Sequence, residues 1–255
     1  MIVRTAARIA AVLLCMLLAG TVPSPSFAQD KVVRLTSLDW PPFSGDALKD
    51  KGAAVAVVRA AFAAVGYELR VGFYPWNRTV ALAKEGGDVQ GYFPEYAGAE
   101  VENDFILSVP LGTSPLGFAE RSQAPVTWNS LDDLATKRIG IVDGYVNTAE
   151  LDARIADGRL RADKANSDAT NLKKLAAGRI DLAVIDLAVM NDLLRTNPDL
   201  TGLASGLRFN AKPLEDKTLH IAFHKGEDGK ALARLFAEGL AKIDAKAILS
   251  QALGS

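Results

Sequence analysis

The stretch LAAGRIDLAVID, residues 175–186, decides the fold, because it runs from a helix end through a glycine into a buried strand. Gly178 can end the helix, since glycine adopts the left-handed conformation that closes helices at little cost. The apolar run after Asp181 is typical of a strand that is buried on both faces. The same order of features occurs in LAKEGGDV, residues 82–89. This repetition predicts two similar α/β lobes instead of one large sheet.

Strands and helices alternate along the chain, which is the pattern of an α/β protein. Apolar alternation and short apolar runs predict strands over residues 32–35, 67–73, 88–93, 138–142, 180–185 and 219–223. Helical spacing of apolar residues predicts helices over 53–65, 77–86, from 147 onward, 170–177, 187–194 and 230–243. Asn147 and Glu150 have the spacing of a capping box, so we expect that helix to begin at Asn147.

An extended segment leaves the first half of the chain near residues 116–119. We therefore expect a first lobe of residues 31–116 and 219–255, and a second lobe of residues 117–218. If the C-terminal helix packs on the first lobe, two strands connect the lobes and can form a hinge.

Residues 1–28 have the three parts of a secretory signal peptide. Arg4 and Arg8 supply the positive charge, an apolar core follows, and Ser26-Phe27-Ala28 offers the small residues that signal peptidase requires. The apolar core is shorter than the roughly 20 residues that span a bilayer. We expect cleavage after Ala28 and export of a soluble protein to the periplasm.

Composition narrows the classes of function. The full chain has 29 Lys and Arg and 30 Asp and Glu. Loss of Arg4 and Arg8 with the signal peptide leaves 27 basic and 30 acidic residues, a net charge of −3. The charges form no basic stripe, so nucleic acid is not an expected partner. The one cysteine, Cys15, lies in the signal segment, and the chain has no Gly-x-Ser-x-Gly elbow and no glycine-rich phosphate loop. His220 and His224 would lie about 13 Å apart on one strand, too far to share a metal ion. We expect no cofactor, no metal site and no catalysis.

Two tryptophans stand in loops at strand ends. Trp40 belongs to WPPF, residues 40–43, where adjacent prolines predict a stiff, extended loop, and Trp76 follows the second strand. Open α/β sheets bind ligands beyond the carboxyl ends of their strands, so both rings are candidates for ligand contact. The alternative is that they pack inside the lobes.

Four motifs come in the order seen in family-3 periplasmic solute-binding proteins, the amino-acid-type family with the type II binding-protein fold. They are WPPF at 40–43, the Gly-Asp before the third strand, IGIVDG at 139–144 and GRIDLAVID at 178–186. The chain resembles this family over residues 31–253. The resemblance implies two lobes, joined by a two-strand hinge, that close over a small polar solute and hand it to an inner-membrane ABC importer.

The resemblance also implies roles for single residues. Two aromatic side chains stack on the ligand in the family, and these positions correspond to Trp40 and Trp76. A glycine turn presents backbone N–H groups to a ligand carboxylate, and that turn corresponds to Gly144, Tyr145 and Asn147.

The charged positions agree only in part with the family pattern. Asp186 corresponds to the carboxylate that receives a ligand ammonium, although it could instead cap the helix that follows. The arginine that clamps an α-carboxylate is missing, because Val101 stands at its place. Arg78 could replace it with a planar fork of donors, or could be a solvated arginine.

Three residues around the end of the third strand complete the candidate set. Phe93, Glu95 and Tyr96 could line the cleft from the first lobe, although Glu95 and Tyr96 could equally be surface loop residues. The sequence therefore predicts a monomeric periplasmic protein that captures a small polar organic solute, amino-acid-like or carboxylate-bearing, for an ABC importer. The alternatives are an orphan sensory or accessory binding protein, or a cyclohexadienyl-dehydratase-like enzyme on the same scaffold.

Overall fold

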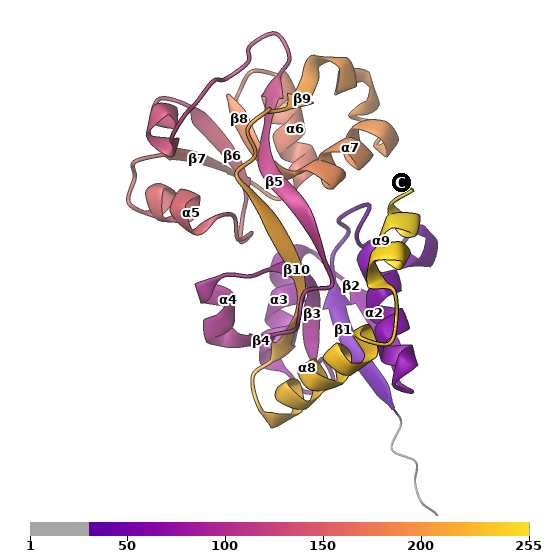
Figure 1. Ribbon diagram of the computed structural model, residues 1–255. Helices are drawn as coiled ribbons and strands as arrows, with labels where there is room; N and C mark the ends of the chain where they lie inside the picture. The colour runs from indigo at the N-terminus through magenta and orange to yellow at the C-terminus, as the bar shows by residue number, and fades with distance from the viewer. Residues whose placement is uncertain (1–30, 255) are drawn as a thin grey trace, which may run out of the picture. The chain divides into compact units, whose positions relative to one another are not determined.

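A computed structural model describes residues 31–254. Residues 32–254 form two α/β lobes joined by two long strands (Figure 1). The signal peptide predicted for residues 1–28 lies outside the described residues. All the strands belong to one sheet, in the order β2-β1-β3-β10-β5-β8-β6-β7, with β4 paired to β10 and β9 paired to β5.

The first lobe contains three parallel strands and one antiparallel strand. β1 (Val32–Ser37) lies between β2 (Glu68–Phe73) and β3 (Gly91–Tyr96) and is parallel to both, and β10 (Glu215–His224) runs antiparallel to β3. The short β4 (Phe105–Leu107) also pairs with β10. The helices of this lobe are α2 (Ala53–Ala64), α3 (Trp76–Glu85), α4 (Ala99–Asp104), α8 (Glu227–Leu240) and α9 (Ala245–Leu253).

The second lobe repeats this arrangement. β6 (Arg138–Val142) lies between β7 (Arg161–Ala165) and β8 (Leu182–Asp186), parallel to both, and β5 (Gly112–Arg121) runs antiparallel to β8, with the short β9 (Leu207–Phe209) on β5. Its helices are α5 (Ala149–Ala156), α6 (Asp168–Ala176) and α7 (Leu187–Thr196). The order β7-β6-β8-β5 matches the order β2-β1-β3-β10 of the first lobe. This equivalence confirms the two similar lobes predicted from the repeated helix–glycine–strand stretch.

The strands β5 and β10 each belong to both lobes (Figure 1). They pair with each other from Gly112 to Leu116 and from Glu215 to Leu219. Beyond this shared part, β10 continues beside β3, and β5 continues beside β8. The two boundaries expected from the sequence, near residues 116 and 219, lie within these strands.

The C-terminal helices return to the first lobe, where α8 and α9 pack on α2. The rings of Phe62 and Phe236 lie 5.6 Å apart across the contact between α2 and α8. A Cβ on Gly239 would lie 2.0 Å from the carbonyl oxygen of Ala61, so the two helices approach closely only because this residue is glycine. Because α8 and α9 follow β10 and pack on the first lobe, β10 is the second strand that connects the lobes.

Three local predictions were wrong in detail. The WPPF loop is a closed turn instead of an extended segment, because the Trp40 carbonyl accepts from the N–H groups of Phe43 and Ser44 at 3.0 and 3.1 Å. The helix α3 begins at Trp76, with Pro75 before it as N-cap, so Asn77 lies in its first turn. The third strand begins at Gly91, three residues later than position 88.

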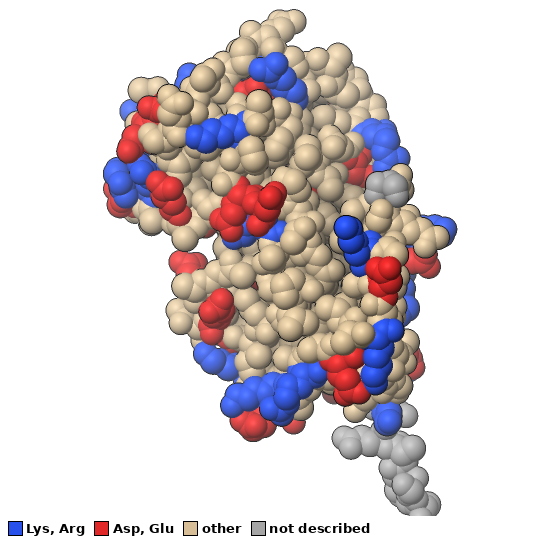
Figure 2. Space-filling view, in the orientation of Figure 1, with Lys and Arg blue, Asp and Glu red and all other residues tan. Residues whose placement is uncertain are grey.

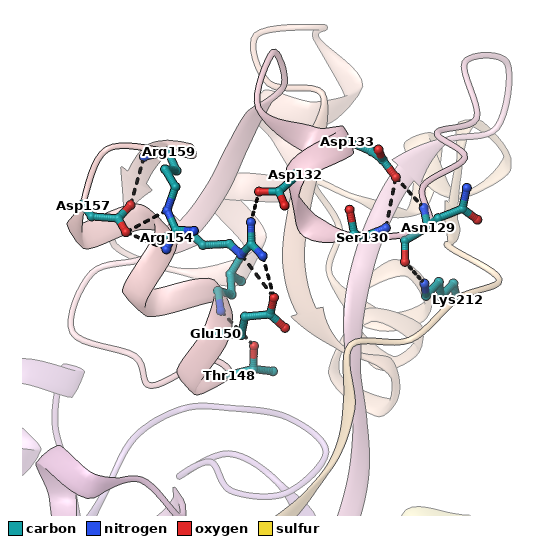
Figure 3. Close-up of polar contacts among 11 residues, drawn as sticks. Asn129, Ser130, Asp132, Asp133, Thr148, Glu150, Arg154, Asp157, Arg159 and Lys212 are labelled. Atoms are coloured by element: carbon teal, nitrogen blue, oxygen red, sulfur yellow. Dashed lines mark hydrogen bonds and ion pairs between the residues drawn. The ribbon is translucent and has the colours of Figure 1, made fainter.

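The predicted cap of α5 was wrong by one residue. The hydroxyl of Thr148 accepts from the N–H of Leu151, whereas Asn147 binds Asp152. Arg154 pairs with Glu150 of the same helix, and its ion pair with Asp132 ties α5 to the 3-10 helix Leu131–Leu134 (Figure 3). The turn before α5 is therefore held between a strand and an anchored helix.

The surface carries both signs of charge on each lobe. In the face shown in Figure 2, Lys and Arg side chains are interspersed with Asp and Glu, and neither sign covers a whole lobe. Within residues 31–254, no helix combines the length and the apolar character needed to cross a membrane.

Candidate functional site

Three adjoining cavities lie where the parallel strands of both lobes end. Two of them share Trp40, Tyr96, Tyr145 and Val146. The third adds Asp39, Phe73 and Tyr74. Trp40 and Tyr96 follow or end strands of the first lobe, whereas Tyr145 and Val146 follow β6 of the second. Because they share these residues from both lobes, the cavities form one inter-lobe cleft.

Aromatic rings form much of the cleft wall. The ring of Trp40 stacks on Phe43 at 4.9 Å and meets the edge of Tyr96 at 6.0 Å. The ring of Trp76 meets Tyr145 edge-on at 5.2 Å across the cleft. The structure thus brings both predicted tryptophans to the cavities, and each also packs against a neighbouring ring.

Glu95 lies at the cleft wall with 4% of its surface exposed. The Tyr92 hydroxyl donates to Oε2 and the Tyr96 N–H donates to Oε1, both at 2.7 Å. Burial raises the pKa of Glu95 to about 7, although these donors and the nearby Lys217 favour the charged form. Glu95 is therefore a buried carboxyl group with only neutral hydrogen-bond donors.

Asp168 is a second buried carboxyl group in the cleft, and the sequence analysis missed it. It begins α6, is 6% exposed, and accepts from Trp40 Nε1 at 3.2 Å. Burial raises the pKa of Asp168 to about 7, and the charge of Asp186 adds to this effect. The sequence did not reveal Asp168 as a residue at a strand end, because the preceding strand β7 reads RADKA and has no apolar run.

Asp186 ends β8 and both lines the cleft and caps α7. Its carboxylate accepts from the N–H groups of Ala188 and Val189, from Ser114 Oγ at 2.8 Å and from the Tyr96 hydroxyl at 3.0 Å. Burial raises the pKa of Asp186. The capping role considered from the sequence is thus present, and four donors already occupy this carboxylate.

Hydrogen bonds join the two lobes across the cleft. Trp76 Nε1 donates to the Gly144 carbonyl at 2.8 Å, and the bonds Trp40–Asp168 and Tyr96–Asp186 also run between the lobes. Gly144 has φ +80°, and a Cβ there would lie 2.7 Å from Asn77 Oδ1. The close approach of the lobes at this turn therefore requires glycine.

Two N–H groups of the turn after β6 have acceptors within the second lobe. The Tyr145 N–H donates to the Val142 carbonyl at 3.2 Å, and the Asn147 N–H donates to Asp152 at 2.9 Å. The amide of Asn147 also donates to Asp152 at 2.7 Å. Tyr145 and Asn147 line the cleft, but this turn does not aim these two N–H groups at it.

Three predicted site residues do not line the three cavities: Arg78, Phe93 and Gly144, whose carbonyl accepts from Trp76. Arg78 is exposed, and its guanidinium lies 5.3 Å from the centre of the Tyr74 ring. Phe93 is fully buried in the core of the first lobe. Val101, at the place of the family's arginine, packs in an apolar cluster with Tyr92 and Phe105.

Every charged side chain that lines the three cavities is a carboxyl group: Asp39, Glu95, Asp168 and Asp186. Lys217, which does not line the three cavities, has its ammonium 5.5 Å from the centre of the Tyr96 ring and 3.4 Å from Glu215. Within the described part of the chain, no group of three or more His, Cys, Asp and Glu side chains could hold a metal ion.

Solved structures with this fold include binding proteins and sensor domains. A histidine kinase sensor domain with similarity to periplasmic binding proteins matches with a TM-score of 0.74 and 19% identity over 88% of this chain and 96% of its own. An ancestral arginine-binding protein bound to glutamine matches with a TM-score of 0.70 and 18% identity over 88% and 99%. The amino acid ABC transporter substrate-binding protein AbpA from Streptococcus pneumoniae, bound to L-arginine, matches with a TM-score of 0.69 and 18% identity over 88% and 93%.

No protein-family model matches the chain, and no curated protein matches its sequence. The structural matches show that the chain has the type II periplasmic-binding-protein fold expected from its motifs.

Proposed function

We propose that this protein is an exported solute-binding protein that holds a small polar organic molecule between its lobes. The observation that carries the proposal is the buried cleft, whose rings and carboxyl groups come from both lobes. Its position at the carboxyl ends of the strands is where open α/β sheets bind ligands. The solved structures of the same fold include proteins bound to arginine and to glutamine, which supports a solute-binding role.

Ligand entry requires the lobes to separate, because the Trp76–Gly144 and Tyr96–Asp186 bonds cross the cleft. The strands β5 and β10 would act as the hinge, with lobe boundaries near residues 116 and 219. Solution scattering should therefore show a smaller radius of gyration once a solute saturates the protein. An unchanged radius with a calorimetrically confirmed solute would exclude lobe closure.

A thermal-shift screen tests the binding role itself. The library should contain amines, amino acids, neutral polyols and organic acids. A solute at 100 times its Kd stabilises the native state by about 2.7 kcal/mol, which raises the Tm of a protein of this size by roughly 5–10 °C. If no class of solute shifts the Tm, the solute-binding proposal is wrong.

Export and delivery form the wider part of the proposal. We propose that cleavage follows Ala28, that the monomeric protein acts in the periplasm, and that an inner-membrane ABC permease receives the solute. Mass spectrometry of exported material should find a chain that begins at Gln29. An intact Met1 on that material would contradict it.

A sensory role is the second candidate, because a histidine kinase sensor domain shares this fold with a TM-score of 0.74. Neighbouring genes for a permease and an ATPase would favour transport, whereas a neighbouring kinase gene would favour sensing.

A dehydratase-like reaction is disfavoured by the charge of the cleft. Prephenate and arogenate carry carboxylates, and no basic side chain lines the three cavities among the described residues. Incubation with either compound should leave it unchanged relative to a protein-free control, as chromatography can show.

A further inference from the structure

We infer that the solute is a small organic ammonium ion, and that the cleft does not need a carboxylate on that ion. This inference rests on the proposed solute-binding function and specifies its ligand class. It departs from the amino-acid-like or carboxylate-bearing solute expected from the sequence.

The first argument is the charge of the walls. Glu95 and Asp168 are buried, face the cavities, and have hydrogen bonds only to neutral donors. A buried carboxylate without a cation is costly, so such groups are normally paired or become protonated. Lys217 offsets part of this charge, but its ion pair is with Glu215, and it makes no hydrogen bond to Glu95. A cation inside the cleft would supply the missing partner.

The second argument is the aromatic surface beside these carboxyl groups. Trp40, Trp76, Tyr96 and Tyr145 all line the cavity that Glu95 lines. The face of an aromatic ring attracts a cation, most strongly where water is excluded, and rings around a carboxyl group are suited to an ammonium ion. An anion would face the negative side of each ring and the carboxyl groups together.

The third argument is that no basic side chain of residues 31–254 lines the three cavities. Lys164 lines an adjoining hollow with Trp76, but its ammonium is paired with Asp143 at 2.9 Å. Arg78 lies over Tyr74 outside the three cavities, and Val101 occupies the place of the family's carboxylate clamp. The N–H groups of Tyr145 and Asn147 donate to acceptors of their own lobe. A carboxylate on the solute would therefore lose its hydration without gaining a partner.

Binding of a cation should also displace protons. Glu95 faces Tyr92, Tyr96 and Lys217, and Asp168 faces Trp40, Asp186, Tyr145 and Tyr96. Burial raises the pKa of both carboxyl groups to about 7, so each is partly protonated near neutral pH in the empty protein. An ammonium ion favours the carboxylate form and lowers these pKa values, so protons leave as it binds.

The decisive experiment uses matched pairs of solutes that differ by one carboxylate. Agmatine is compared with arginine, cadaverine with lysine, and choline with betaine, by calorimetric titration of the exported chain at pH 8. We expect at least one amine to bind, and to bind at least tenfold more tightly than its carboxylate-bearing counterpart. The inference is overturned if the carboxylate-bearing member is the tighter ligand in every pair that binds.

Failure of the inference is distinguishable from failure of the proposed function. If none of the three amines binds while a neutral or anionic solute from the thermal-shift library does, the protein is a solute-binding protein with another ligand class. If no solute of any charge binds, both the function and the ligand class are wrong.

Variants that keep shape and remove charge provide the second test. Glu95→Gln and Asp168→Asn should each weaken binding of the best amine about 10- to 100-fold. Glu150→Gln removes the same charge from the surface of α5, and should leave the affinity within twofold. Equal affinity in wild type and in a folded Glu95→Gln and a folded Asp168→Asn variant would overturn the inference.

Proton release gives a test on the wild-type protein, which does not depend on variants that fold. Titrations at pH 6.5 in two buffers with different ionisation enthalpies should give different apparent heats, with protons released to the buffer. Identical heats in both buffers would contradict the assigned role of the two carboxyl groups.

Discussion

The cleft and a cluster in the second lobe contain the same kinds of group, but only in the cluster does a cation bond directly to the buried acid. In that cluster, Glu120 is 1% exposed and accepts from Arg208 Nε at 2.8 Å and from Asn210 at 2.7 Å. The Lys212 ammonium lies 4.3 Å from the centre of the Trp128 ring, and it also donates to the Asn129 carbonyl (Figure 3).

In the cleft, Glu95 has neutral hydrogen-bond donors only, and the nearby Lys217 is paired with Glu215. Among residues 31–254, the rings of Trp40 and Trp76 pack on other aromatic rings and not on a cation. In the cluster, the Arg208 guanidinium pairs with Glu120 and the Lys212 ammonium lies over Trp128. In the cleft between the lobes, we infer that a bound solute supplies the corresponding cation.

The largest expected difference between the two regions is in their response to pH. Amine binding needs ionised Glu95 and Asp168, whose pKa values lie at about 7 in the empty protein. A fall from pH 8 to pH 5 should therefore weaken binding about 100-fold for each carboxyl group that must lose a proton. Calorimetry across this range measures the effect, and an affinity that stays constant would contradict it.

Stability without ligand should change in the opposite direction. The folded-state pKa of Glu95 is about 7, above the value of about 4.3 in an unfolded chain, so the folded state binds the extra proton between these values. The stabilising contribution is full below about pH 4 and is lost as the pH rises through 7. The Tm difference between wild type and Glu95→Gln should therefore become less favourable to wild type from pH 5 to pH 8. A constant difference would count against the raised pKa.

Arg208→Met would leave the buried Glu120 without a cation bonded to it, as Glu95 is in the cleft. Glu120 would remain buried with neutral donors only, which should cost about 1.5 kcal/mol at pH 8, the low end for a charged hydrogen bond, because half of the Arg208 side chain is exposed. The Tm should fall by roughly 3–6 °C. Binding in the cleft should stay the same, and the exposed Lys230→Met serves as the control. An unchanged Tm would mean that Arg208 is not the structural partner of Glu120.

Trp76→Leu should remove one ring from the cleft. Loss of a cation–π contact of about 0.5–2 kcal/mol weakens amine binding about 2- to 30-fold. Trp76→Phe keeps a ring and should retain most of the affinity, whereas Trp128→Phe, in the cluster, should have no effect on binding. Equal losses in Trp76→Phe and Trp76→Leu would show that the Gly144 hydrogen bond matters more than the ring.

Arg78→Ala should have the smallest effect. Its guanidinium lies over Tyr74 outside the three cavities, so calorimetry should find affinity within twofold of wild type. A loss of tenfold or more in a folded variant would restore Arg78 as the substitute for the missing carboxylate clamp.

The topology could be predicted from the sequence because its signals are local. The helix–glycine–strand stretches at 82–89 and 175–182 precede equivalent strands, β3 and β8, and the apolar runs identify most of the sheet. The strand β7 was missed because RADKA pairs only with β6 at the edge of the sheet and is largely solvated. The helix α9 was also missed, although it packs on α2.

The candidate site was less accessible to prediction because it depends on contacts between the lobes. Trp40, Trp76 and Glu95 stand at strand ends, which the pattern of elements reveals, and all three line the cleft. The burial of Asp168 depends on the Trp40 indole of the other lobe, and no local pattern encodes that contact. Arg78 was chosen by its chemistry and its nearness to Trp76, but it is exposed and packs on Tyr74 without lining the three cavities.

The central claim is that the cleft holds the solute, and tryptophan fluorescence tests it most directly. The chain has three tryptophans, two in the cleft and Trp128 in the remote cluster. In a Trp128→Phe variant, Trp40 and Trp76 are the only fluorophores of this kind. The account predicts a saturable emission change whose Kd matches the calorimetric value for the same solute. Unchanged emission at a saturating concentration, with the thermal shift still present, would place the solute elsewhere on the protein.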